Sequence, residues 1–71
     1  MARKEEWHRI IGNDPPNDDR LALEVWNKDN LVCMVRSENT GQTITWFKTQ
    51  DDIVIPFNWF YEVMQEAKRR I

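Results

Sequence analysis

Residues 20–49 read RLALEVWNKDNLVCMVRSENTGQTITWFKT. Apolar residues recur at every second position from Leu21 to Val25, which is the period of a half-buried β-strand. Two polar stretches interrupt the apolar pattern, at residues 27–30 (NKDN) and 38–41 (ENTG). Asn, Asp and Gly favour tight turns because they tolerate positive φ. The stretch therefore predicts three antiparallel strands, over residues 20–26, 31–36 and 42–49.

The C-terminal residues 57–71 predict an amphipathic helix. At about 100° per residue, the apolar side chains share one broad arc, and they are Phe57, Phe60, Tyr61, Val63, Met64, Ala67 and Ile71. Either Asn58 caps the helix or Pro56 takes its first position. Residues 53–55 are interpreted as a short fourth strand or as an extended lead into the helix, because Pro56 keeps Ile55 out of the α region.

Together these patterns predict an α+β fold in which an antiparallel three- to four-stranded meander packs one face on the C-terminal amphipathic helix. A short N-terminal helix or arm lies at one edge. The predicted core sets Phe60, Met64 and Ala67 against Leu23, Val25 and Ile44. We expect a single small domain over residues 1–71, with an N-terminal element and polar linker over 1–19 and the sheet and helix over 20–71.

The N-terminal segment fits two structures. Trp7, Ile10 and Ile11 share one helix stripe, which favours a short helix over residues 2–11. An edge strand over residues 7–10 is the alternative. Residues 12–19 read GNDPPNDD and carry no apolar side chain, which is typical of a linker.

Composition limits the classes of function. The chain has 71 residues, of which 10 are Lys or Arg and 12 are Asp or Glu, so the formal net charge is −2. A strongly basic nucleic-acid binder is not indicated. The single cysteine and single histidine exclude an internal disulfide and a two-histidine ligand set. No apolar run approaches the ~20 residues of a membrane-spanning helix. We expect a cytoplasmic protein without a membrane partner.

Catalytic chemistry is not expected. Cys33 lies among apolar residues and is interpreted as a core side chain, and no third group is apparent that would orient a Cys33–His8 pair. The acidic pairs at residues 18–19 and 51–52 lie in polar segments between the predicted elements and are interpreted as solvated turns. Acid–base catalysis by paired carboxyl groups needs one pKa raised by burial. We therefore predict no catalytic, cofactor-binding or metal-binding residue, and a chain that is not an enzyme.

One candidate surface emerges from the strands. Aromatic and basic residues are interleaved there, namely Trp26, Lys28, Arg36, Trp46, Phe47 and Lys48. Such a face is typical either of a base-stacking platform or of a protein interface, where Trp and Arg dominate the binding energy. Glu24 and Glu38 on the same strands make the local charge nearly neutral, which favours the protein interface. Alternatively, Trp7, Ile10 and Ile11 cover this face.

A resemblance supports the nucleic-acid alternative. The order of three strands, a short strand and a helix, with residues 53–56 (IVIP) leading toward Trp59, resembles the positive-cofactor-type transcriptional coactivators over residues 20–71. The resemblance implies a dimer that binds single-stranded DNA on a curved sheet. The Lys- and Gly-rich stretch of that family is replaced here by residues 49–52 (TQDD), which lack the charge that would bind phosphate.

The sequence as a whole favours a small non-enzymatic binding protein that acts through a protein–protein surface, as an inhibitor, adaptor or regulator of a larger partner. A single-stranded nucleic-acid-binding module is the alternative. We also expect a homodimer in preference to a monomer, because strand edges and surplus aromatic side chains both need covering.

Overall fold

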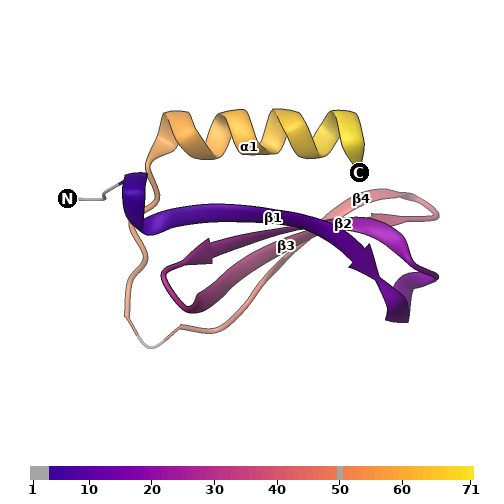
Figure 1. Ribbon diagram of the computed structural model, residues 1–71, viewed down its shortest axis with the longest axis horizontal. Helices are drawn as coiled ribbons and strands as arrows, with labels where there is room; N and C mark the ends of the chain where they lie inside the picture. Colours follow the sequence, from indigo (N-terminus) through magenta and orange to yellow (C-terminus); the bar gives the residue numbers. More distant parts are fainter. Residues whose placement is uncertain (1–3, 50) are drawn as a thin grey trace.

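A meander of four antiparallel strands forms one layer of the protein and one helix forms the other (Figure 1). The computed structural model describes residues 4–49 and 51–71. The elements are β1 (Trp7–Asp14), β2 (Arg20–Asn27), β3 (Asn30–Glu38), β4 (Gly41–Trp46) and α1 (Phe57–Arg70), with short 3₁₀ turns at Lys4–Glu6 and Pro15–Asn17. Strands lie in the order β1-β2-β3-β4. The predicted α+β class, with a meander and a C-terminal helix, is confirmed.

The favoured N-terminal helix is wrong, and the edge-strand alternative is what forms. β1 pairs with β2 along its whole length, from Trp7 opposite Asn27 to Asp14 opposite Arg20. This pairing satisfies the backbone groups of β2 that would otherwise line an open edge, whereas an isolated helix of ten residues gains little on its own. Residues 2 and 3 of the predicted helix lie outside the described residues.

The polar stretch over residues 12–19 closes a hairpin inside the sheet. Its first three residues belong to β1, and the remainder connects β1 to β2. Asp18 and Asp19 both have φ of 57°, a conformation that short polar side chains tolerate. The Asp19 amide donates to the Asp14 carbonyl at 3.1 Å. The interpretation as a linker is therefore replaced by a β1–β2 connection.

The two predicted turns are confirmed, and the strand ends differ. Lys28 takes φ of 54° between β2 and β3, and Gly41 takes φ of 134° where β4 begins. β4 ends at Trp46, three residues before the predicted end at Thr49. Residues 53–55 form no strand and lead into α1, and Pro56 immediately before the helix has extended backbone.

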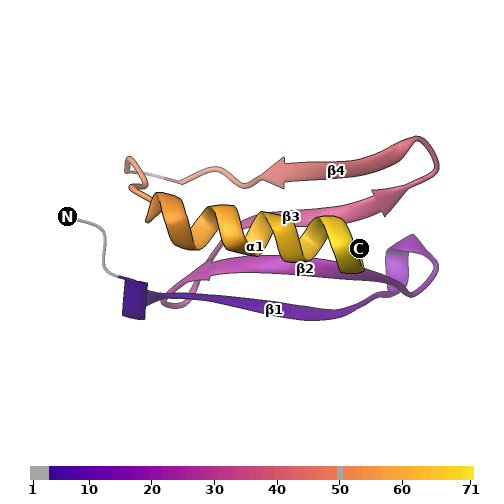
Figure 2. The same cartoon turned by 90° about the horizontal axis from the view of Figure 1, so that it is seen from above.

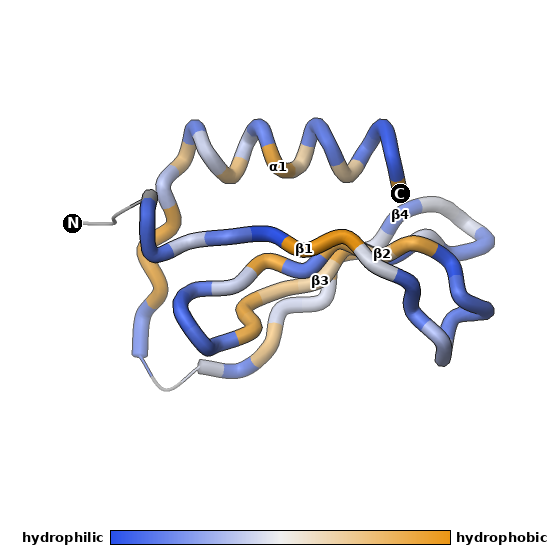
Figure 3. The backbone as a smooth tube through the Cα atoms, in the orientation of Figure 1, coloured by the Kyte–Doolittle hydropathy of each residue, from blue (hydrophilic) through white to orange (hydrophobic). Residues whose placement is uncertain are grey.

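The core lies between α1 and the middle of the sheet, where apolar residues concentrate along the central strands (Figure 3). Its most deeply buried side chains are Leu23, Val25, Val32 and Cys33. A register shift opposite Val25 and Trp26 makes Val32 an extra residue on β3, and such a bulge re-aims a side chain. From the helix, Val63 and Ala67 are buried and Phe60 and Met64 pack partly buried against the cluster.

Ile44, which was expected in this core, lies at the surface, as do two residues of the predicted apolar arc of the helix. Ile44 is 46% exposed on the edge strand β4, and Phe57 and Tyr61 are exposed on α1. The apolar arc of the helix is wider than its contact with the sheet, so residues at the border of the arc stay in solvent. The helix itself begins at Phe57, with Pro56 in the N-cap position and no side-chain cap, so neither predicted start is realised in full.

Contacts from both edge strands hold α1 over the sheet, where it runs above the central strands when seen from above (Figure 2). On the β1 side, Trp7 packs on Trp59 with ring centroids 5.9 Å apart. On the β4 side, Trp46 packs on Phe60 at the same separation. Gln42 Nε2 also donates to the Ala67 carbonyl at 3.1 Å. The direction of the helix is therefore fixed by contacts at three of its residues, Trp59, Phe60 and Ala67.

We predict that Leu23→Ala lowers the free energy of unfolding by about 2–5 kcal/mol, because it removes buried methyl groups and leaves a cavity. Leu21→Ala on the same strand is the matched control, since Leu21 is 40% exposed and Leu23 is 0% exposed. Urea unfolding followed by tryptophan fluorescence measures both. Equal losses in the two variants would contradict the core described above.

Candidate functional site

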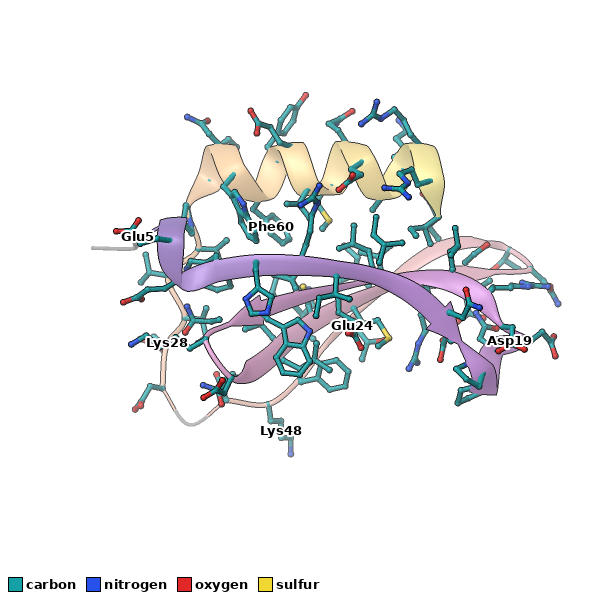
Figure 4. All side chains as sticks on the ribbon, viewed as in Figure 1. Glu5, Asp19, Glu24, Lys28, Lys48 and Phe60 are labelled. Atoms are coloured by element: carbon teal, nitrogen blue, oxygen red, sulfur yellow. The ribbon has the colours of Figure 1, made fainter. Side chains whose placement is uncertain are left out.

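The face of the sheet opposite α1 is open. Because side chains alternate along a strand, residues adjacent to the core-facing Leu23, Val25 and Val35 point to this face. Figure 4 shows Glu24 below the sheet and Phe60 above it, between sheet and helix. On the three long strands, alternation and pairing place on the open face the side chains of His8, Ile10, Asp14, Ala22, Glu24, Trp26, Leu31, Met34 and Arg36. We call this surface the open face.

A stacked aromatic pair lies on the open face. His8 and Trp26 are opposite each other on β1 and β2, and their rings are 6.1 Å apart and inclined by only 8°. Trp26 Nε1 donates to Glu24 Oε1 at 3.3 Å, which holds the indole in place. His8 was missed as a site residue because it was assigned to a helix. Edge-strand pairing of residues 7–10 was the signal that could have found it.

Arg36 lies at one end of the open face and is already paired. Its Nε is 3.1 Å from Asp14 Oδ2 and 3.1 Å from the sulfur of Met34. Asp14 is buried, and its Oδ2 forms no hydrogen bond within the described residues, so the contact with Arg36 is an ion pair without hydrogen-bond alignment. A buried carboxylate needs such a cation. Arg36 of β3 therefore forms an ion pair with Asp14 of β1 that stabilises the fold. A ligand would have to compete with Asp14 for this guanidinium group.

The two lysines of the predicted surface lie at its other end, next to acidic groups. Lys28, in the β2–β3 turn, has its Nζ 3.6 Å from Glu6 Oε1. Lys48 points away from the helix (Figure 4). It lines a hollow of about 540 Å³ together with Asp29, Asp51 and the apolar side chains of Trp26, Leu31 and Ile53. Carboxylates thus accompany both cations.

The predicted aromatic residues divide between the two faces. Trp46 packs on Phe60 and therefore belongs to the helix side, where it is 54% exposed. Phe47 follows it, and its amide donates to the Val32 carbonyl at 2.9 Å, so alternation turns its side chain to the open face. The open face brings together Trp26, Arg36 and Phe47, with Lys48 at its border and Lys28 in the turn, but not Trp46.

The N-terminal segment does not cover the open face. It extends the sheet as β1, with Trp7 buried in the core and Ile11 packed against it. Ile10 points to the open face and is 46% exposed. The alternative in which all three residues lie over Trp26 is therefore wrong, because strand geometry sends Ile10 and its neighbours to opposite faces.

The chemistry of Cys33 matches that of a core residue. It is fully buried, and burial raises the pKa of its thiol to about 11. It lies in the helix-side cluster, whereas His8 stacks on Trp26 across the sheet. No group of three His, Cys, Asp or Glu side chains suited to a metal occurs among residues 4–49 and 51–71. Nor does any helix in that part of the chain have the length and apolar character needed to cross a membrane.

The chain matches no protein-family model, and it matches neither a curated protein nor a solved structure. No relative supplies a function for the open face. What can be said of its ligand rests on the contacts and charges described above.

We predict that Cys33 makes the protein less stable at alkaline pH. In the unfolded chain the thiol ionises near its ordinary pKa of 9.0, and in the folded protein only near 11. Stability from the neutral thiol is therefore complete below pH 9 and is lost as pH rises toward 11, by about 1.4 kcal/mol per unit. Urea unfolding at stepped pH measures this slope.

Cys33→Ala provides the control, because it lacks the titrating group. The difference in unfolding free energy between the native chain and this variant should shrink between pH 9 and 11. A constant difference across that range would contradict the burial of the thiol. A thiol reagent at pH 8 should also modify the unfolded chain much faster than the folded one.

Proposed function

We propose that this chain is a small non-enzymatic binding protein that recognises a larger protein partner through the open face, as an inhibitor, adaptor or regulator of that partner. The observation that carries the proposal is the His8–Trp26 stack, flanked by Ile10 and Phe47, on a sheet face that no other element of the described chain covers. Ile10 and Phe47 are exposed and Trp26 is half-buried, whereas Ala22 and Met34 of the same face are buried. An apolar patch that stays partly exposed on a small protein marks an interaction surface.

The arrangement of the face resembles the anatomy of protein interfaces. Aromatic and aliphatic side chains occupy its middle together with Glu24, whose carboxylate accepts from Trp26, and further charged groups lie toward its ends, such as the Arg36–Asp14 pair and Lys48. Hot spots of binding energy are enriched in Trp, Tyr and Arg and sit centrally, surrounded by polar residues that exclude water. Trp26 is held by Glu24, so little side-chain entropy is lost when a partner docks on it.

Charge favours a protein over a nucleic acid. Phosphate affinity depends on unpaired, clustered cations that release counterions. Here Arg36 contacts Asp14, Lys28 contacts Glu6, and Lys48 shares its hollow with two aspartates. A single strand of nucleic acid would meet a nearly neutral surface. The stacked rings still offer a base-stacking platform, so single-stranded nucleic acid is the second candidate ligand.

An oligonucleotide titration separates the two candidates. We predict that single-stranded DNA and RNA bind no more tightly than the non-specific range of about 10⁻⁴–10⁻⁶ M at physiological salt. A nanomolar complex that weakens steeply with salt, and whose salt slope falls in Lys28→Ala, Arg36→Ala and Lys48→Ala, would instead assign the open face to nucleic acid.

Truncation of the central indole tests the protein interface. We predict that Trp26→Ala weakens binding of a protein captured from lysate by about 2 kcal/mol or more, with shallow salt dependence. Tyr61→Ala is the matched control, because Tyr61 is an exposed aromatic on α1. Nuclease treatment of the lysate should leave capture unchanged. Equal capture by both variants, with both folded by circular dichroism, would remove the open face from the interaction.

A further inference from the structure

The two edges of the sheet are protected to different degrees. The edge strand β1 carries Arg9 and Asp14, and charged side chains discourage pairing with another strand. Arg9 also forms an ion pair with Glu66 of α1, with Nη2 donating to Oε2 at 3.1 Å. The other edge strand, β4, reads GQTITW, so it has neither charge nor proline, and every one of its residues is exposed.

The unpaired backbone groups of β4 can be identified from the ladder. The Phe47 amide donates to the Val32 carbonyl, and in an antiparallel ladder inward and outward groups alternate. The amides and carbonyls of Gln42, Ile44 and Trp46 therefore point away from β3. Three consecutive outward sites on an uncharged edge form a template for another strand.

We propose that this edge pairs with β4 of a second copy of the chain, antiparallel, across a two-fold axis at Ile44. Ile44 then faces Ile44 of the other copy, and Gln42 faces Trp46 in both directions. All three outward sites of each copy are satisfied in this register. The proposal is independent of what the open face binds.

Symmetry favours a second copy as the occupant. An isologous interface places the same patch of both copies in contact, so a charged edge would repel the identical edge of the second copy. β4 carries no charge, so this repulsion is absent.

Exposed apolar side chains lie where such a dimer would bury them. Ile44 and Trp46 lie on the helix side of β4, and each is about half exposed. Trp46 packs on Phe60. Phe57, one turn before Phe60, is 78% exposed. Because a two-fold axis perpendicular to the sheet keeps both helices on one side, these residues from the two copies would fill the space between the helices. Burying them adds an apolar contribution to the backbone pairing.

The dimer would also change the open face. Two four-stranded sheets joined at β4 make one eight-stranded sheet, and the faces opposite the two helices become continuous. Each dimer then carries two His8–Trp26 stacks. A partner with two matching sites would be bound with the gain in apparent affinity that linked sites provide.

A pair of charge variants tests the proposal. Ile44→Lys and Ile44→Glu each set like charges across the axis, so each alone should sediment at the chain mass of 8.6 kDa, whereas the native chain sediments at twice that mass. An equal mixture of the two variants should recover the dimer, because Lys then faces Glu. Recovery in the mixture also shows that both variants fold.

Ile10→Lys is the matched control, because Ile10 is as exposed as Ile44 but lies on β1 and the open face. It should stay dimeric while it weakens binding to a partner of the open face, so the two proposals fail separately. A native chain that stays at 8.6 kDa up to millimolar concentration, or an equal mixture that stays monomeric, would overturn the β4 dimer. The β4 dimer would also be overturned if the native chain is monomeric and Ile44→Lys abolishes capture of a protein. The β4 edge would then be assigned to a strand of a foreign protein.

Discussion

One helix has to cover a four-stranded sheet, and it is too narrow to do so. Four strands about 4.8 Å apart span roughly 14 Å between the outer strands, whereas a helix with its side chains is about 10 Å wide. Trp7 with Trp59, and Arg9 with Glu66, tie α1 to β1. The hydrogen bond from Arg9 lowers the pKa of the Glu66 carboxyl, so the ion pair persists to a lower pH than an ordinary glutamate would allow. The side chains on the helix side of β4 are therefore left partly exposed to solvent.

This constraint accounts for both surfaces to which a role is assigned. On the far side of the sheet, no element of the described chain covers Trp26 and its neighbours, so an apolar and aromatic face is held open by the same core that stabilises the fold. At the β4 edge, α1 leaves Ile44 half exposed, and Trp46 also stays half exposed although it packs on Phe60. The two surfaces differ in character, because the first offers side chains and the second offers backbone donors and acceptors.

Local patterns were sufficient to predict much of the fold, whereas pairing partners were not. The alternation from Leu21 to Val25, the turn at Lys28 and the helix from Phe57 depend on neighbouring residues, and all were predicted. Trp7 and Ile11 fit a helix and a strand equally well by pattern, and only their pairing with β2 decides between them. His8 was missed as a site residue for this reason.

The candidate site was predicted in part for a similar reason. Alternation after Leu23 and Val25 was enough to send Trp26 to the face opposite the helix. Trp46 and Phe47 could not be placed, because the register of β4 against β3 sets their faces. The neutralisation of Arg36 by Asp14 joins residues 22 positions apart, and no sequence spacing indicates it.

The measurement that tests the exposed β4 edge most directly is amide hydrogen exchange by NMR across a concentration series. The Ile44 amide should gain protection as concentration rises, while the outward amides of Arg9 and Ile11 on β1 continue to exchange fast. Fast exchange at Ile44 at every concentration, or protection that grows on β1 instead, would contradict the account.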